Sequence, residues 1–113
     1  MNSVPAVYQV VVAAAVERDL DEIYDYIAAE ASPARAEKVF DRLREQIHSL
    51  AMEPERGSWP RELLALGIRE FRQLPSRPYR IFYRVTGQRV TVLLIADGRR
   101  NLKTLLERRL LSI

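Results

Sequence analysis

The sequence contains no cysteine and a single histidine, His48, and these two shortages exclude several kinds of functional site. Without cysteine the chain has no disulfide, no thiol nucleophile and no zinc site built on thiolates. One histidine is too few for the His clusters that bind most catalytic metals. His48 lies beside the apolar stripe of a predicted helix, where a lone histidine is usually a boundary residue. We therefore expect no metal site and no cofactor.

Long apolar runs and catalytic signature motifs are also missing. The longest uninterrupted apolar run is the seven residues from Val10 to Val16, whereas a membrane-spanning helix needs about 20. The sequence has no glycine-rich phosphate loop, no HExxH motif and no serine nucleophile elbow. Its 113 residues suffice for one domain with one core. We expect a single cytoplasmic domain over residues 1–113 that does not associate with membranes.

What the chain has in excess is arginine, and its charge is unevenly distributed. Sixteen of the 18 cations are arginine. Residues 1–55 hold five cations and eleven anions, a net charge of −6, whereas residues 56–113 hold thirteen cations and four anions, a net charge of +9. Arginine richness alone can reflect the base composition of a genome. The asymmetry between the halves indicates a basic surface that meets an acidic partner.

Hydrophobic periodicity predicts an α+β fold with helices on one face of a mostly antiparallel sheet. Two helical stripes separated by a few residues must form an antiparallel helical hairpin. Three later segments read as a strand meander, which completes a sheet begun by an N-terminal strand. The expected strands are 7–12, 68–74, 79–85 and 90–96, and the expected helices are 17–29, 33–52, one turn at 63–67, and a short C-terminal helix at 102–110.

Four arginines form the candidate binding site. Arg80 and Arg84 alternate onto one face of a strand, with Arg72 expected near them, and Arg99 and Arg100 follow the last strand. Such a group could bind a phosphate backbone or an acidic protein segment. The alternative is that these are solvated surface arginines with no ligand.

Phosphate cleavage would also need a general acid and a general base beside these arginines. The pattern places no histidine, lysine or tyrosine clearly beside them. Tyr79 and Tyr83 alternate onto the opposite face, toward the helices, and we interpret them as core residues.

Several short motifs occur in the order found in a known family, and together they cover almost the whole chain. They are residues 17–27 (ERDLDEIYDYI), similar to a "DL..I..YI" helix; residues 50–57, similar to "L...P..G"; residues 79–85 (YRIFYRV), similar to a "YRI.Y.V" strand; and the Arg pair at 99–100. In this order, and in a chain of this length, they resemble the RelE/ParE superfamily of toxins from bacterial type II toxin–antitoxin systems. The resemblance implies the same α+β fold.

The resemblance implies one of two activities. RelE-like members are ribosome-dependent endoribonucleases that cut mRNA, and ParE-like members bind DNA gyrase and block replication. In RelE-like members, arginines matching Arg80 and Arg100 help to bind and cleave RNA, and a tyrosine or histidine near the C terminus adds an acid or base. Residues 102–106 (LKTLL) hold neither, and the segment from Arg99 onward is similar to the amphipathic tail of ParE-like members.

We therefore expect a growth-inhibiting gyrase inhibitor rather than an enzyme. A ribosome-dependent ribonuclease using Arg80 and Arg100 is the alternative, and a non-toxic relative that only binds its antitoxin is a further one. The target-binding residues expected from the charge pattern are Arg80, Arg84, Arg99 and Arg100.

The resemblance also implies a cognate antitoxin with an acidic, partly disordered region that folds on the toxin. A basic surface attracts an acidic segment, and an exposed apolar groove lets a helix or strand dock. We expect the antitoxin to cross the basic half and the helical hairpin. Leu102, Leu105 and Leu106 of the C-terminal helix are candidate contacts.

Overall fold

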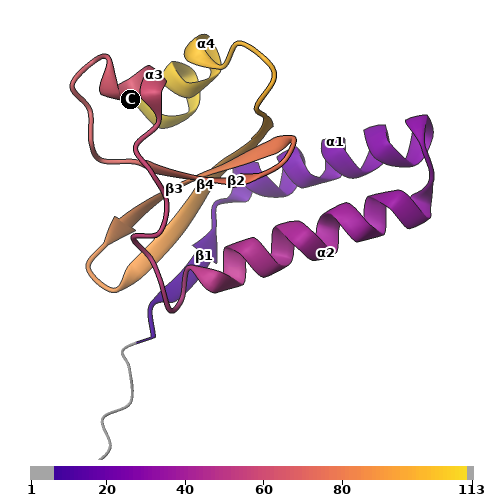
Figure 1. Ribbon diagram of the computed structural model, residues 1–113, viewed down its shortest axis with the longest axis horizontal. Helices are drawn as coiled ribbons and strands as arrows, with labels where there is room; N and C mark the ends of the chain where they lie inside the picture. The colour runs from indigo at the N-terminus through magenta and orange to yellow at the C-terminus, as the bar shows by residue number, and fades with distance from the viewer. Residues whose placement is uncertain (1–6, 112–113) are drawn as a thin grey trace, which may run out of the picture.

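A four-stranded sheet with the strand order β1-β4-β3-β2 organises the protein (Figure 1). The computed structural model describes residues 7–111. The strands are β1 (Gln9–Val12), β2 (Arg72–Ser76), β3 (Tyr79–Thr86) and β4 (Arg89–Asp97). β1 runs parallel to β4, and the two other pairings are antiparallel. The predicted α+β fold with a mostly antiparallel sheet is therefore confirmed.

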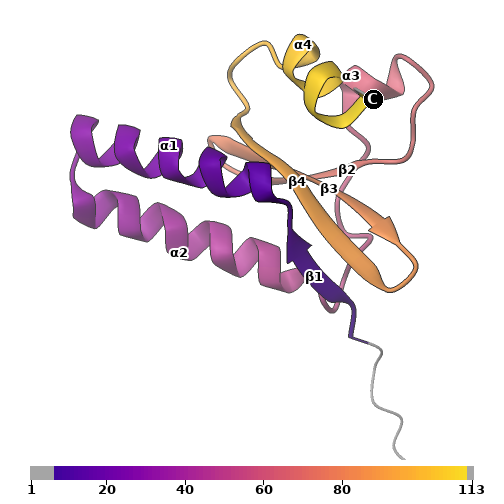
Figure 2. The same ribbon diagram turned by 180° about the vertical axis from the view of Figure 1, so that it is seen from behind.

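The predicted helical hairpin consists of α1 (Ala14–Glu30) and α2 (Pro33–Ser49). Ser32 caps α2 as its sequence indicates, since its Oγ accepts a hydrogen bond of 3.0 Å from the backbone N–H of Arg35. The hairpin contacts the sheet near the start of α1 and the end of α2, and its far end projects past the sheet in Figures 1 and 2. α1 begins three residues earlier than predicted, because the alanines before Val16 are strong helix formers.

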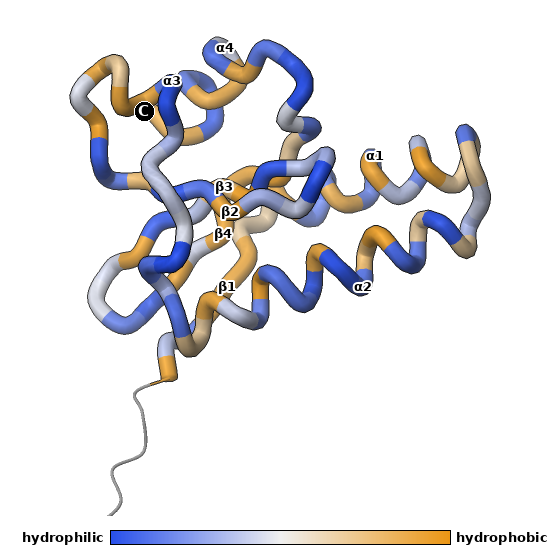
Figure 3. Tube along the Cα trace, viewed as in Figure 1, coloured by the Kyte–Doolittle hydropathy of each residue, from blue (hydrophilic) through white to orange (hydrophobic). Residues whose placement is uncertain are grey.

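Side chains on the two faces of the sheet pack into two separate cores. Toward the hairpin, Tyr79, Ile81 and Tyr83 pack against residues of α1 and α2, as the strand alternation predicts. The opposite face buries Phe82 and Leu94. β4 is buried on both faces, which explains why its sequence is almost entirely apolar. Figure 3 shows hydrophobic residues gathered where the strands cross and alternating with hydrophilic ones along both helices.

The second face is covered by three short helical elements. They are α3 (Arg61–Leu64), α4 (Lys103–Leu106) and the π-helical turn η1 (Glu107–Leu111). Leu63 of α3 and Leu106 of α4 are both buried in the core on this face. The C-terminal helix was predicted as one regular helix over 102–110, and the structure instead divides it between α4 and η1. Within residues 7–111, no helix is both long enough and apolar enough to span a bilayer.

β2 lies further along the chain than predicted. The pattern predicts a strand over 68–74 followed by a turn at 75–78, whereas the strand spans Arg72–Ser76 and the turn is only the two residues between Ser76 and Tyr79. β2 is an edge strand, and an edge strand accommodates Pro75, which cannot donate a ladder hydrogen bond. The helical turn also begins earlier than predicted, at Arg61, and Gly67 with a φ of 75° follows it.

Candidate functional site

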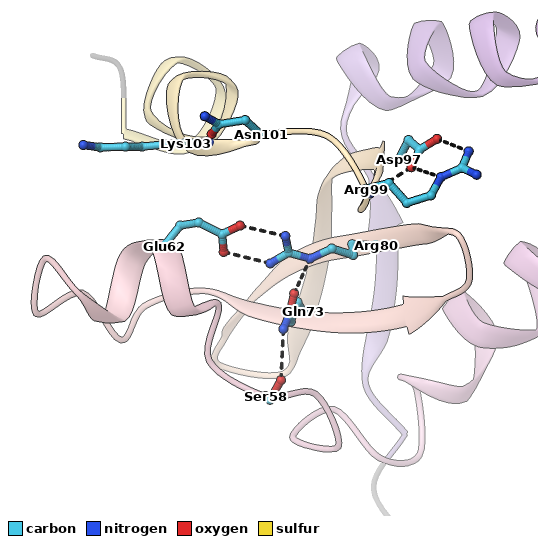
Figure 4. Close-up of polar contacts among 8 residues, drawn as sticks. All are labelled: Ser58, Glu62, Gln73, Arg80, Asp97, Arg99, Asn101 and Lys103. Atoms are coloured by element: carbon cyan, nitrogen blue, oxygen red, sulfur yellow. Dashed lines mark hydrogen bonds and ion pairs between the residues drawn. The ribbon is translucent and has the colours of Figure 1, made fainter.

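Arg80, the central residue of the predicted arginine site, is held in an ion pair. Its Nη1 and Nη2 donate hydrogen bonds of 2.7 and 2.9 Å to the two carboxylate oxygens of Glu62, and its Nε donates to Gln73 (Figure 4). The side chains of Arg80 and Glu62 are only 11% and 15% exposed. A bidentate guanidinium–carboxylate pair consists of two charge-assisted hydrogen bonds, which are stronger than neutral ones. The charge of Arg80 is therefore already satisfied within the protein.

Neighbouring residues fix Arg80 in this position. Gln73 accepts the hydrogen bond from Arg80 through its side-chain oxygen. Its amide nitrogen donates a second hydrogen bond, of 3.3 Å, to the hydroxyl of Ser58. A side chain at Gly98 would lie 2.7 Å from Cδ of Arg80, so the glycine leaves the space in which the arginine stem lies. The hydrogen bonds from Arg80 lower the pKa of Glu62 below its ordinary value, against the smaller opposing effect of burial.

The other three predicted arginines do not join Arg80 in one cluster. Arg99 turns back onto Asp97, with Nη2 and Oδ2 2.6 Å apart, and lowers the pKa of that carboxyl (Figure 4). Arg84 lies at the other end of β3, where its guanidinium carbon is 5.8 Å from the centre of the Phe71 ring. Arg100 is exposed at the edge of a groove. Arg72 does not lie near Arg80 either, because its register with Tyr83 places it on the opposite face of the sheet.

A groove of about 650 Å³ lies between α1 and the C-terminal segment, by which we mean α4 and η1. Figure 2 shows where these elements lie relative to β4. The end of β4 forms its floor. Apolar side chains and charged side chains of both signs line the groove. The residues that line it are Ala15, Arg18, Asp19, Glu22, Ile23, Tyr26, Tyr79, Leu94, Ile95, Ala96, Asp97, Arg100, Leu105, Arg108 and Arg109.

A second, partly buried ion pair lies among the residues that line this groove. Arg109 of η1 donates two hydrogen bonds of 2.9 Å each to Asp19 of α1 and a third, of 3.0 Å, to the backbone carbonyl of Leu93. Asp19 also accepts from the backbone N–H of Ile95 at 3.2 Å. Hydrogen bonding to Asp19 raises the pKa of Arg109. These contacts join the C-terminal segment to both α1 and β4.

The groove contains two residues that the sequence pattern did not assign to a site. Arg18 is a cation in an otherwise acidic helix, and Tyr26 is an aromatic residue with 63% exposure on the polar side of the same helix. In the sequence, the lone cation and the aromatic residue on the polar side of this helix were the signals that could have indicated a site. Tyr79 belongs to the core as predicted but also reaches the groove, where burial raises its pKa. A tyrosine with a raised pKa stays protonated at neutral pH and is a poor general base.

The three candidate antitoxin contacts differ in exposure. Leu102 and Leu106 are 1% and 0% exposed and pack in the core against the sheet. Leu105 is half-buried and lines the groove. Of the three, Leu105 is the one that a docked partner reaches without displacing the C-terminal segment. Among residues 7–111, no group of three or more histidine, aspartate and glutamate side chains is arranged to hold a metal ion.

Comparisons with known proteins give a family from the sequence and a similar fold from a solved structure. Residues 10–102 match the family described as "ParE toxin of type II toxin-antitoxin system, parDE". A solved structure described as "Chromosomal ParDE TA system from P. aeruginosa" has a similar fold, with a TM-score of 0.67. It is 23% identical in sequence, and the alignment covers 81% of this chain and 97% of that one. No curated protein matches the sequence.

Proposed function

Because this chain belongs to the ParE family of toxins from type II toxin–antitoxin systems, we propose that it inhibits DNA gyrase, and so replication, by binding. The match of residues 10–102 to that family is the observation that carries the proposal. Gyrase is the target that the resemblance to ParE-like members implies. Such an inhibitor acts in the cytoplasm, where gyrase and DNA are found.

The state of Arg80 supports binding over RNA cleavage. A ribonuclease would need this guanidinium free to meet a phosphate, but here Glu62 and Gln73 occupy its donors. Arg100 is exposed, and the tyrosine of β3 in the same groove, Tyr79, has a raised pKa. Arg80 therefore has no free donor pair to offer a phosphate, and Tyr79 stays protonated at neutral pH.

The groove between α1 and the C-terminal segment is the surface that we assign to the antitoxin. It lies where the acidic helical hairpin meets the basic half of the chain, and its lining combines apolar side chains with the exposed Arg18 and Arg100. An amphipathic acidic segment complements such a groove, because its apolar side chains reach the floor while its carboxylates meet the arginines. The P. aeruginosa protein of similar fold is described as part of a ParDE system, and we propose a ParD-like antitoxin for this chain.

One experiment in cells separates the three candidate functions. The chain is induced alone, and the DNA-damage response is measured alongside primer-extension mapping of mRNA ends. Gyrase inhibition predicts a damage response with intact mRNA, and co-expression of the adjacent antitoxin restores growth. Codon-phased mRNA cuts that Arg80→Ala abolishes would instead establish a ribonuclease. Normal growth on induction would leave a non-toxic, antitoxin-binding relative.

A further inference from the structure

A second hollow, of about 320 Å³, lies beside Trp59, the only tryptophan in the sequence. It is smaller than the groove and shares no lining residue with it. Three arginines, two glutamates and two apolar side chains surround it. The residues that line it are Glu55, Trp59, Arg69, Glu70, Arg72, Arg84 and Val85. The family resemblance assigns no role to this hollow, and of its lining residues only Arg84 is a target-binding candidate from the charge pattern.

The wall that carries Trp59 is held in place by Arg72. The guanidinium carbon of Arg72 lies 4.0 Å from the centre of the indole ring, within the range of a cation–π contact. The same guanidinium donates hydrogen bonds of 2.8 Å to the carbonyl of Gly57 and 3.3 Å to that of Glu55. Arg72 therefore joins the loop to β2, and the indole is oriented before any ligand arrives.

Two further contacts make the loop rigid. Ser58 and Gln73 exchange backbone hydrogen bonds of 3.0 and 2.7 Å, so the loop forms a short bridge along the outer edge of β2. Gly57 donates its N–H to the hydroxyl of Tyr83 at 2.9 Å, and that hydroxyl donates to the carbonyl of Pro54 at 2.8 Å. A preorganised wall loses little conformational entropy on binding.

Two other arginines that line the hollow have free donors. Arg69 and Arg84 are exposed, and within residues 7–111 neither has an ion pair or a hydrogen bond from its side chain. Arg84 lies over the edge of the second core, with its guanidinium 5.8 Å from the ring of Phe71. In contrast with Arg80, these guanidinium groups are available to an anion.

We propose that the hollow binds one nucleotide of a single-stranded nucleic acid. Arg69 and Arg84 meet the phosphate, because a guanidinium fork matches two phosphate oxygens. The indole of Trp59 packs against the base, as aromatic side chains do in proteins that bind single strands. A volume of about 320 Å³ is at the small end of ligand pockets and suits one nucleotide.

The lining favours a nucleotide over an acidic peptide. A peptide helix or strand needs a row of apolar contacts, whereas this hollow offers only Trp59 and Val85. The proposal does not depend on gyrase being the target, so the two can fail separately.

The fluorescence of Trp59 reports binding in the hollow, because Trp59 is the only tryptophan in the sequence. The full-length chain is titrated with oligothymidylate of ten residues, with thymidine monophosphate, with inorganic phosphate and with polyglutamate, and tryptophan emission is recorded. We expect a saturable change with the oligonucleotide and a weaker one with the monophosphate. Polyglutamate and inorganic phosphate at equal charge should leave the emission unchanged.

Matched charge variants locate the binding. Arg69→Gln and Arg84→Gln should each weaken oligonucleotide binding roughly tenfold, since each removes a charge-assisted contact. Arg89→Gln removes the same charge from an exposed position outside the hollow, and should weaken binding less than twofold. Trp59→Leu, followed by the anisotropy of a labelled oligonucleotide, should weaken binding roughly fivefold or more. Circular dichroism of each variant confirms that it is folded.

Three results would overturn the proposal. One is the absence of any saturable emission change up to millimolar oligonucleotide. A second is an equal response to polyglutamate, which would indicate an acidic protein segment as the ligand. The third is an equal loss of binding in Arg89→Gln and Arg84→Gln, which would show attraction by the overall charge of the surface and no site.

Discussion

Arg80 of β3 and Glu62 of α3, eighteen residues apart in the sequence, form a bidentate ion pair with distances of 2.7 and 2.9 Å. The pair joins the sheet to the short helix that covers its second face, and it occupies the arginine on which a nuclease mechanism would depend. The ion pair with Glu62 therefore makes Arg80 a structural residue in this fold. We therefore expect the stability of the fold to depend on this contact.

Removing Glu62 should destabilise the protein strongly. Glu62→Ala leaves Arg80 partly buried without its carboxylate, and breaking a buried pair in this way costs about 3 kcal/mol. Urea denaturation followed by circular dichroism measures the free energy of unfolding. The double variant Arg80→Met with Glu62→Leu should lose much less, because no charge is left unpaired.

Glu45→Gln on α2 provides the control for this experiment. Glu45 is exposed, and its substitution should change the free energy of unfolding by less than about 0.5 kcal/mol. An equal loss in Glu62→Ala and Glu45→Gln would show that the ion pair contributes nothing.

The same ion pair should make stability depend on acid pH. Arg80 lowers the pKa of Glu62 in the folded protein below its ordinary value of 4.5. The unfolded chain therefore binds the proton more readily, so the contribution of the pair is present above pH 4.5 and is lost as the pH falls through the lower, folded pKa. The free energy of unfolding is measured at several values between pH 3 and 6, a range of about three units that spans this change. As the pH is lowered, this free energy should fall less steeply in Glu62→Gln than in the natural sequence. Parallel curves would contradict this account of Glu62.

Gly57 should tolerate no side chain. A Cβ there would lie 2.5 Å from the hydroxyl of Tyr83 and 2.6 Å from the backbone carbonyl of Gln73. Gly57→Ala should therefore cost about 2 kcal/mol through overpacking and should shift the emission of Trp59, which belongs to the same loop. Gly67→Ala is the comparison: its φ of 75° is unfavourable, but no atom lies within 4 Å, so the cost should be nearer 1 kcal/mol. A greater loss in Gly67→Ala would contradict the steric argument.

Asp19 should control the attachment of the C-terminal segment. In Asp19→Asn, Arg109 loses its charged partner, which should cost about 2 kcal/mol, or roughly 30-fold in the equilibrium for local opening. Amide hydrogen exchange at residues 103–111 should accelerate accordingly, while exchange in β3 should change little. Asp21→Asn, on the same helix but exposed and away from the groove, should leave exchange in the segment unchanged. Equal effects of the two substitutions would show that the Asp19–Arg109 pair does not hold the segment.

Periodicity predicted the helical hairpin and the two faces of β3 because each depends on local spacing. Tyr79, Ile81 and Tyr83 alternate with Phe82, and a half-buried strand must follow that alternation. The Ser32-Pro33 start of α2 was equally visible, since the cap is formed by neighbouring residues.

The partners of the arginines could not be predicted in this way. Glu62 meets Arg80 only because α3 folds back over the second face, and no local spacing records that path. β2 was misplaced because its limits depend on pairing with β3 and on the loop bridge at Gln73, both of which are tertiary contacts. The sequence pattern singled out four arginines but could not separate Arg80, which Glu62 neutralises, from the exposed Arg84 and Arg100.

The most direct test of the central claim is a supercoiling assay with purified DNA gyrase and the purified chain. The account predicts that the chain inhibits supercoiling of relaxed plasmid in a concentration-dependent way, and that the cognate antitoxin added first abolishes the inhibition. It also predicts that a translating ribosome extract with the same amount of chain keeps its mRNA intact. Unaffected supercoiling together with codon-phased mRNA cleavage would contradict the account and identify the chain as a ribonuclease.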